Sequence, residues 1–403
     1  MEILLASLML LWANVSTAHP GVTMEQIVQA AVVSVQQPAE NLPPPDATPG
    51  QKPANGTDSG KQEYVKIDPQ KDAPVVKGIY STANSAGSAR FAKLVKLIDD
   101  TDLNAMVIDV KDDYGYITYN TDDPKLLKYG NTQNIIPDID KTIKTLQDHQ
   151  IYPIARIVVF KDTVLAKKRH DLSYLNPDGS LWNNGKAVNP DSFVNPYMKE
   201  VWDYNIEVAK DAAKHGFKEI QFDYVRFPEG FEKRADKLTY TRDGRKRIEV
   251  IAAFVKYARE QLNPLGVRVS VDIFGYAASV PAAEGIGQDF NAIAQYVDVI
   301  CPMIYPSHYS TGWFGSKVPD AHPYTTINGA MVDTHKKLAE IGDLKPVIRP
   351  WIQDFTATWV PGHIQYGKKE IEEQIRALAD NNVHEFLLWD SHNTYTEGVD
   401  YSK

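Results

Sequence analysis

The chain has 403 residues, of which 43% are hydrophobic, so it can form one large domain or two ordinary ones around a sizeable core. Its formal net charge of -9 argues against a nucleic-acid-binding protein, which would carry a basic face. The single cysteine, Cys301, excludes an intramolecular disulfide and a cysteine-based metal site, and its apolar neighbours favour a buried core position.

Residues 1–18 contain an apolar stretch, Ile3–Trp12, that is too short for a comfortable membrane span. Small residues follow at Ser16–Ala18, in the outline of a signal peptide, although Glu2 stands where a positive charge is usual. We therefore predict a signal peptide or a membrane anchor at 1–18, and with it a secreted or extracytoplasmic protein.

Residues 19–73 include a proline-rich stretch, 41–53, without apolar periodicity. Such a composition cannot bury enough surface to fold. We predict a disordered linker at 19–73 and one folded domain at 74–403.

In the folded region, apolar strand-like segments alternate with helix-like segments. Strands are expected at 75–80, 105–110, 152–160, around Asp223 within 220–228, and at 267–274, 297–305, 346–352 and 385–389. Helices are expected near 88–99, 139–149, 196–215, 247–262, 290–296, 330–341 and 368–381. A long insertion, 161–193, follows the third strand, and its Pro177–Gly179 turn signal is compatible with a binding wall or with a short hairpin.

Apolar strands that alternate with helices indicate a parallel sheet covered on its faces. Eight such units predict an α/β protein with a (β/α)8 TIM-barrel fold, preceded by the extended linker. The rival is an open doubly wound sheet, which usually carries a glycine-rich turn after its first strand. Residues 81–85 contain no such turn, which favours the barrel.

Polar and aromatic residues gather where the predicted strands end, and a barrel has its active site at the carboxyl ends of its strands. The candidates in chain order are Asp109, Lys111, Arg156, Gln221, Asp223, Arg226, Asp272, Tyr305, His308, Trp351, Gln353, Asp354, Trp389 and Asp390. Strand alternation predicts that Asp109 shares a face with Lys111, and that Gln221 shares a face with Asp223.

Carboxylates beside aromatic rings suit the cleavage of glycosidic bonds, which needs one protonated carboxyl and one ionised carboxylate. Asp223, with Arg226 three residues on, fits the ionised role because an arginine lowers the pKa of a neighbouring carboxyl. Asp272 on the next strand is the candidate acid. The other twelve candidates are predicted to contact substrate.

Each assignment has a structural alternative. Two pairs could be purely structural: Asp223 could form only an ion pair with Arg226, and Asp109 could pair with Lys111. Other aspartates could act as caps, Asp272 on a turn and Asp354 and Asp390 on helices. Trp351 and Trp389 could be core residues, and His308 could be a surface residue.

Six motifs in order resemble the bacterial glycoside hydrolase family catalogued as domain of unknown function 4015. They are Val76–Tyr80, Val107–Asp112, Gln221–Pro228, Val271–Gly275, Pro302–Pro306 and Arg349–Asp354. The resemblance implies a TIM barrel related to alpha-amylase-like hydrolases, with a nucleophile on the fourth strand and an acid on the fifth, at Asp223 and Asp272. The amylase group has Glu at the acid and a His-Asp pair near the seventh strand, where this chain has Asp272 and Gln353-Asp354.

The leading hypothesis is an exported glycoside hydrolase that acts on a cell-surface or extracellular polysaccharide. The alternative is a non-catalytic carbohydrate-binding barrel. An amidohydrolase-type metal enzyme would need a His-x-His on the first strand, which residues 77–80 lack, and a phosphate-binding barrel would need glycine-rich turns after the last two strands. We expect a polysaccharide or oligosaccharide partner, no cofactor or metal, no nucleic acid, a possible N-terminal membrane tether, and a monomer.

Overall fold

The computed structural model describes residues 73–342 and 345–402. The predicted signal peptide or membrane anchor lies outside the described residues, as does the predicted linker up to residue 72. The strands are β1 (Lys77–Ser81), β2 (Ala105–Lys111), β3 (Tyr152–Val158), β4 (Glu219–Asp223), β5 (Arg268–Phe274), β6 (Val299–Met303), β7 (Val347–Ile348), β8 (Trp351–Gln353) and β9 (Phe386–Trp389).

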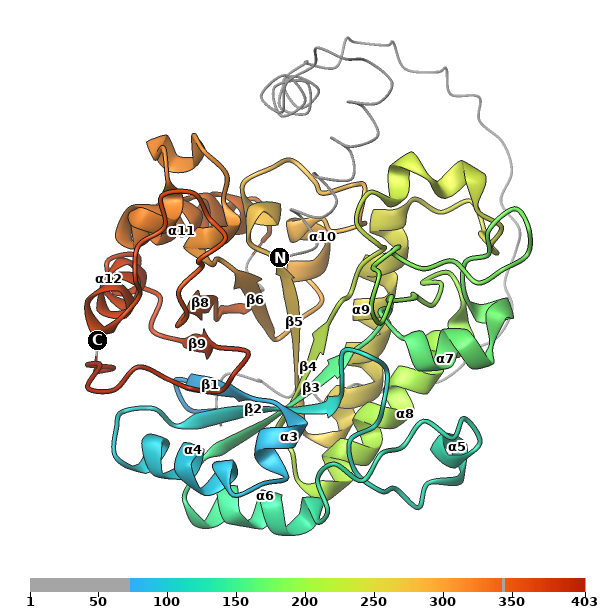
Figure 1. The fold of residues 1–403 in the computed structure, drawn as a ribbon, viewed down its shortest axis with the longest axis horizontal. Helices are drawn as coiled ribbons and strands as arrows, with labels where there is room; N and C mark the ends of the chain where they lie inside the picture. Colours follow the sequence, from blue (N-terminus) through green and yellow to red (C-terminus); the bar gives the residue numbers. More distant parts are fainter. Residues whose placement is uncertain (1–72, 343–344, 403) are drawn as a thin grey trace, which may run out of the picture. The chain divides into compact units, whose positions relative to one another are not determined.

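All these strands belong to one parallel sheet that closes on itself (Figure 1). Each strand from β1 to β6 pairs with the next along the chain, and β9 pairs with β1 to close the ring. The short strands β7 and β8 both pair with β6 and together occupy the seventh strand position. The result is a closed barrel with eight strand positions, which confirms the predicted (β/α)8 fold.

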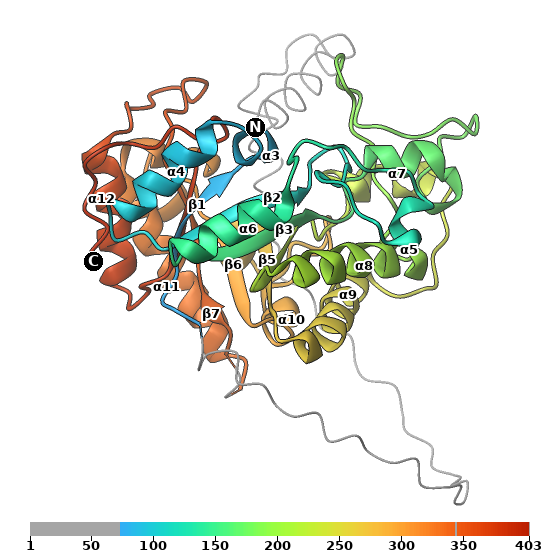
Figure 2. The ribbon, with the colours of Figure 1, turned by 90° about the horizontal axis from the view of Figure 1, so that it is seen from below.

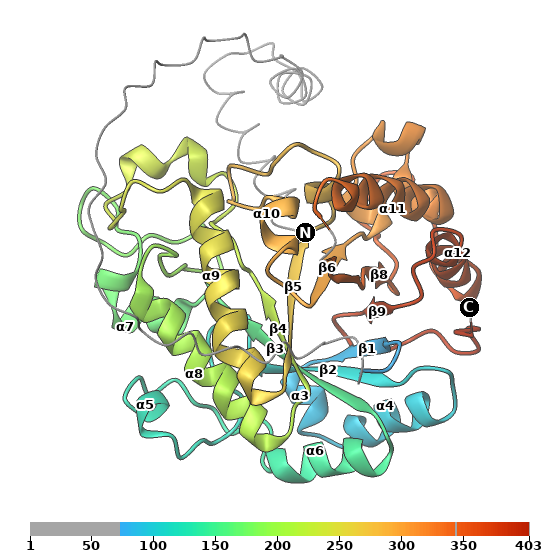
Figure 3. The ribbon, with the colours of Figure 1, turned by 180° about the vertical axis from the view of Figure 1, so that it is seen from behind.

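Helices connect successive strands and surround the barrel. They are α3 (Ala83–Ala86), α4 (Arg90–Asp99), α5 (Pro124–Leu127), α6 (Ile139–Asp148), α7 (Thr163–Lys168), α8 (Lys199–His215), α9 (Arg247–Leu262), α10 (Phe290–Ala294), α11 (Pro323–Ala339) and α12 (Lys368–Ala379). Figure 2 shows α4 and α6 on the side of β1–β3, and Figure 3 shows α8 and α9 lying across β3, β4 and β5.

Short 3-10 turns lie at η1 (His170–Leu172), η2 (Phe231–Lys233), η3 (Ala235–Lys237), η4 (Asn263–Leu265), η5 (Gly275–Ala278), η6 (Pro306–His308), η7 (Trp313–Gly315) and η8 (Pro319–Ala321).

Local chemistry explains where several elements begin and end. Asp138 and Asp289 cap α6 and α10, because each side chain accepts a backbone N–H from the first turn of its helix. The seventh strand is broken between Ile348 and Trp351, where the sequence predicted a continuous strand. Pro350 lies in the break and has no N–H to give to the sheet. Helix α11 starts at Pro323, seven residues before the expected start, with this proline in its first turn.

The core has two parts. Apolar side chains of the barrel interior form one cluster that includes Tyr80, Cys301 and Trp351, and a larger cluster lies between the strands and the helices. Cys301 is fully buried, as predicted. At the amino-terminal end of the barrel, the buried Arg349 contacts Glu219 at 2.6 Å and Glu385 at 2.7 Å. Of the helices the structure describes, none is long and apolar enough to cross a membrane.

Candidate active site

Arg156 holds two carboxylates together at the carboxyl end of the barrel. Strands β2, β3 and β4 are neighbours, and Arg156 in β3 is in register with Asp109 in β2. Its guanidinium donates from Nη1 to Asp109 Oδ1 at 2.7 Å, and from Nη2 and Nε to Asp223 Oδ2 at 2.6 and 3.0 Å. All three side chains are buried. Three candidates spread over 115 residues of sequence thus form one charged cluster.

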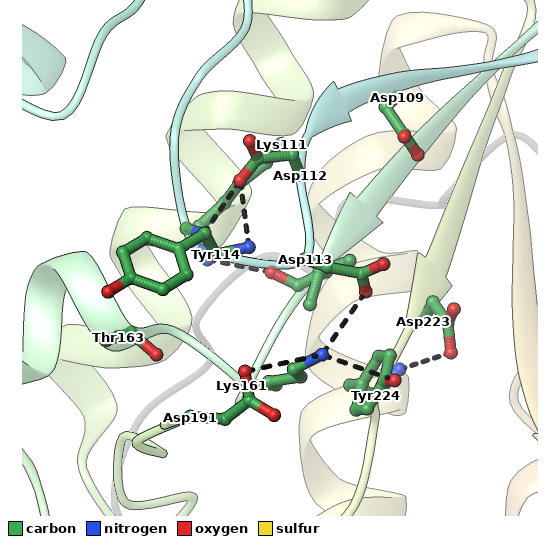
Figure 4. A network of polar contacts seen from close by, with 12 residues as sticks. Asp109, Lys111, Asp112, Asp113, Tyr114, Lys161, Thr163, Asp191, Asp223 and Tyr224 are labelled. Atoms are coloured by element: carbon green, nitrogen blue, oxygen red, sulfur yellow. Dashed lines mark hydrogen bonds and ion pairs between the residues drawn. The ribbon is translucent and has the colours of Figure 1, made fainter. Parts of the chain in front are cut away.

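The backbone after β4 fixes the orientation of Asp223. Tyr224 adopts a left-handed conformation with φ 51°, which is uncommon for a residue other than glycine. This conformation turns the Tyr224 N–H back onto Asp223 Oδ1 at 2.6 Å (Figure 4). Both carboxylate oxygens of Asp223 therefore accept hydrogen bonds, and the strained backbone at this point is typical of functional sites.

Asp272 in β5 lies in a different environment from Asp223. Its side chain is buried and makes no ion pair with any residue that the structure describes, while Trp351 Nε1 donates to Asp272 Oδ1 at 2.7 Å. Burial, followed by the neighbouring charge of Asp223, raises the pKa of Asp272 well above its usual value. Burial therefore favours the protonated form of Asp272, which lies next to a carboxyl group that is paired with arginine.

Asp109 has a third environment. Tyr80 donates a 2.6 Å hydrogen bond from its hydroxyl to Asp109 Oδ2. Burial raises the pKa of Asp109 to about 6, although Arg156 opposes the shift. Tyr80 was not among the predicted site residues, yet it lies near the carboxyl end of the first strand, where the rule used for the other strands would have found it.

Aromatic rings line the barrel beside these carboxylates. Trp389 is stacked on Tyr80, with ring centroids 4.2 Å apart, and it also meets Trp351 edge-on at 5.5 Å and Tyr305 at 6.4 Å. The Arg156 guanidinium lies 5.8 Å from the Trp389 ring centroid. Trp351 is almost completely buried, whereas Trp389 is partly exposed and can present an edge or face to a ligand.

The predicted position of Lys111 is wrong. The pairing of β2 with β3 shifts register between Asp109 and Lys111, so the two side chains do not share a face (Figure 4). Lys111 instead forms a fully buried ion pair with Asp162 at 2.7 Å and donates to Asn205 of α8 at 3.1 Å. The alternative pairing of Asp109 with Lys111 is wrong for the same reason.

Replacement of Lys111 by Met is expected to lower the free energy of unfolding by about 3 kcal/mol, because the buried Asp162 carboxylate loses its cation. Urea denaturation of the purified variant measures this loss. The double variant K111M/D162N should recover part of it, because it removes the unpaired charge as well. If K111M were as stable as the native protein, the pair would contribute nothing to the fold.

The predicted partnership of Asp223 with Arg226 is also wrong. Arg226 contacts Glu229 at 3.2 Å, and its guanidinium lies 4.8 Å from the ring centroid of Tyr224 and 4.7 Å from that of Phe274. The cation that pairs with Asp223 is Arg156, which comes from the neighbouring strand.

The remaining candidates divide between the barrel interior and its rim. Gln221 is buried in the interior and donates to Cys301 Sγ at 3.4 Å. Gln353 is buried among internal partners, accepting from Ser307 N at 3.1 Å and donating to Asp320 Oδ1 at 3.1 Å, so it is turned away from the carboxylate cluster.

Asp354, Asp390 and His308 lie at the rim. Asp354 accepts hydrogen bonds from Thr396 N and Oγ1, and burial raises its pKa to about 6. Asp390 accepts from His392 N at 2.7 Å, so both aspartates hold loops and neither caps a helix. His308 ends the turn η6 and is exposed, with its ring 5.0 Å from that of Tyr305.

A second polar cluster beside Asp223 was missed by the sequence reasoning (Figure 4). Lys161 lies 3.8 Å from both Asp113 and Asp191, and its amino group is 4.7 Å from the Tyr224 ring centroid. Asp113 also accepts from Arg156 Nη2 at 3.2 Å, and half of its side chain is exposed. Lys161 and Asp191 belong to the insertion after β3, so this segment contributes to the mouth of the barrel.

The same insertion also contains the short hairpin that was the alternative prediction. Leu175 bridges Leu181 in antiparallel fashion around a turn in which Gly179 has φ 82°, a conformation that favours glycine. In the sequence, the only indication that charged residues of the insertion belong to the site was their position in a long loop after a strand.

Comparisons with known proteins agree with this architecture. A family model described as "Putative glycosyl hydrolase domain" matches residues 78–395. A hypothetical protein from Ruminiclostridium thermocellum is 38% identical over 48% of this chain and 96% of its own, with a TM-score of 0.43. No curated protein matches the chain.

Two glycoside hydrolase structures share the fold at low sequence identity. The glycoside hydrolase domain of PgaB (BpsB) from Bordetella bronchiseptica is 11% identical, covers 79% of this chain and 94% of its own, and has a TM-score of 0.56. The alpha-galactosidase TtGalA from Thermus thermophilus, in complex with stachyose, is 11% identical, covers 81% of this chain and 63% of its own, and has a TM-score of 0.50.

Proposed function

The chain belongs to this family of glycosyl hydrolase domains and is a carbohydrate-active enzyme, and from that premise we propose that Asp223 and Asp272 cleave a glycosidic bond by a two-carboxylate mechanism. The observation that carries the proposal is the contrast between the two groups. Asp223 is held by Arg156, whereas the buried Asp272 has no cationic partner among the described residues and a raised pKa. One carboxylate and one carboxylic acid are the pair that this chemistry needs.

In the proposed reaction, Asp272 gives its proton to the glycosidic oxygen while the bond from that oxygen to the anomeric carbon breaks. Asp223 either attacks the anomeric carbon or removes a proton from the water that attacks it. One water is consumed in both cases. Its oxygen and one of its protons form the new hydroxyl group on the anomeric carbon, and its other proton replaces the one that Asp272 gave to the leaving group. Arg156 holds the Asp223 carboxyl group in place before it reacts.

The rim of the barrel supports a polysaccharide as the substrate. Phe355 contacts Tyr305 and is stacked on Trp359 at 6.0 Å, so aromatic rings continue outward from the carboxylates. On another side, Phe274 is stacked on Tyr276 at 5.6 Å. Trp359 and Tyr276 are the two aromatic side chains among the exposed large hydrophobic residues of the described chain. Flat exposed rings of this kind can pack against the apolar faces of successive sugar units.

Trp359→Ala is expected to raise KM for a long oligosaccharide about fivefold, with kcat changed less than twofold, because Trp359 binds sugar units away from the reacting bond. Steady-state kinetics on a substrate series of increasing length measures this effect, which should vanish for the shortest substrates. Val332→Ala, which truncates an exposed side chain on α11, is the control. An equal rise in KM for short and long substrates would contradict a distal sugar site.

We also propose that the protein is exported and meets a cell-surface or extracellular polysaccharide. The support is the apolar stretch Ile3–Trp12 with small residues after it. Fractionation of cells that express the tagged full-length chain, followed by mass spectrometry of its N-terminus, distinguishes a cleaved signal peptide from a retained anchor. Recovery in the cytoplasmic fraction would contradict export.

The function is tested by incubating the purified protein with a panel of bacterial and plant polysaccharides and measuring the release of reducing ends. Release by the native protein supports a hydrolase. Binding to a glycan array without release from any polysaccharide would favour the carbohydrate-binding alternative.

A further inference from the structure

A cavity of about 450 Å³ lies beside the start of α9 and is lined mainly by cations and two tyrosines. The lining residues are Tyr197, Tyr240, Arg242, Gly244, Arg245, Lys246, Arg247, Ile248 and Glu284. Four of them are cationic and one is a carboxylate. The volume is within the usual range for pockets that hold small ligands or single sugar units.

Most of these cations are not neutralised within the protein. Arg245 contacts Asp243 at 2.6 Å, but Arg242, Lys246 and Arg247 make no ion pair with a residue that the structure describes. Arg247 donates from Nε to the backbone oxygen of Glu284 at 3.0 Å, and Arg242 lies 5.9 Å from the Tyr240 ring centroid. In a chain with a net charge of -9, this concentration of unpaired cations attracts an anion.

The connections after β3 and β4 build the cavity together. Tyr197 precedes α8 and donates from its hydroxyl to the backbone oxygen of Arg245 at 2.8 Å, while Asn195 donates to the backbone oxygen of Thr241 at 2.7 Å. Both connections leave the carboxyl ends of their strands, which is the end where Asp223 lies. The cavity and the carboxylates are thus on the same end of the barrel.

Resting on the proposed function, we propose that this cavity binds an acidic sugar unit of the substrate, so that the enzyme acts on an anionic polysaccharide. The guanidinium groups can form paired hydrogen bonds with a carboxylate or phosphate on the sugar. The tyrosine rings, whose centroids are 6.4 Å apart, provide surface for its ring. The acidic unit binds away from the bond that is cleaved.

The test compares glycans that differ only in charge. Binding of the full chain is measured by calorimetry with a hexamer of galacturonic acid against its neutral methyl ester, and with a phosphorylated mannan against its dephosphorylated form. The native protein should bind at least one charged member about tenfold more tightly than its neutral partner, and the preference should weaken with salt. Tighter binding of the galacturonic acid hexamer would identify a carboxylate as the recognised group, and tighter binding of the phosphorylated mannan would identify a phosphate.

The exposed residues Arg242 and Lys246 allow a variant with little risk to the fold. R242Q/K246Q should lose most of the charge preference and keep its affinity for the neutral glycans. K218Q/K345Q removes two exposed cations at the opposite end of the barrel, where β4 and β7 begin, and should keep the preference.

Three results would overturn the inference: no charge preference in either pair, an equal loss of preference in the two double variants, or equally tight binding of a single-stranded DNA oligonucleotide at the same cations. Failure of the proposed function is a separate outcome. It would appear as charge-selective binding without hydrolysis of any glycan, whereas hydrolysis without charge selectivity would contradict only the inference about the cavity.

Discussion

Asp223→Asn is expected to reduce kcat/KM on the responding polysaccharide by at least about a thousandfold, since the variant has no carboxylate to attack the anomeric carbon or to activate water. Asparagine has nearly the same shape, so the protein should remain folded. The cost in stability should be about 1–2 kcal/mol, because Arg156 loses one of its charged hydrogen-bond partners. Reducing-end release and thermal denaturation of the same preparation measure the two effects separately.

Asp113→Asn is the matched control for this variant. Asp113 also contacts Arg156, at 3.2 Å, but its side chain is half exposed and its other cationic neighbour is Lys161. Neutralising it removes one negative charge beside the same guanidinium and leaves Asp223 in place, so activity should fall by no more than about tenfold. Equal losses in the two variants would mean that the charge balance around Arg156 matters and that Asp223 has no special role.

Asp272→Asn should lower activity on the polysaccharide by about a hundredfold to ten-thousandfold, the usual contribution of a positioned general acid. Asparagine can still accept the hydrogen bond from Trp351 Nε1, so the local structure should survive. Aryl glycosides with good leaving groups need little protonation, and their cleavage should fall far less. Equal losses on both kinds of substrate would contradict the assignment of Asp272 as the acid.

The pH dependence gives an independent check on Asp272. Its raised pKa favours the protonated form, so activity should be lost as the pH rises through the pKa of Asp272 in the folded protein, when the proton leaves. The variant D272N has no such proton, so the fall in activity at alkaline pH, the alkaline limb of the pH–activity profile, should be absent. The Trp351 hydrogen bond favours the ionised form, so Trp351→Phe should move the limb of the otherwise native enzyme to higher pH.

Helices, strands and strand-end residues that can be recognised from neighbouring residues could be predicted from the sequence. The helix expected at 247–262 has these bounds in the structure, and every expected strand position is present in the barrel. The aspartates Asp109, Asp223 and Asp272 could be identified because a carboxylate at the end of an apolar strand is visible within a few residues of sequence. Strand order followed from the alternation of strands and helices, since parallel connections leave few other topologies.

The partners of these carboxylates were decided by the tertiary structure. Arg226 is three residues from Asp223 in sequence, yet the cation that holds Asp223 is Arg156, 67 residues away on the adjacent strand. A one-residue register shift in β2 moved Lys111 away from Asp109, because side chains alternate with a period of two and one extra residue reverses the face. The sequence by itself therefore determined the barrel and the carboxylates at its strand ends. Pairing between strands, which depends on closure of the whole sheet, decided that Asp223 is held by Arg156 and that Asp272 is buried without an ion-pair partner among the described residues.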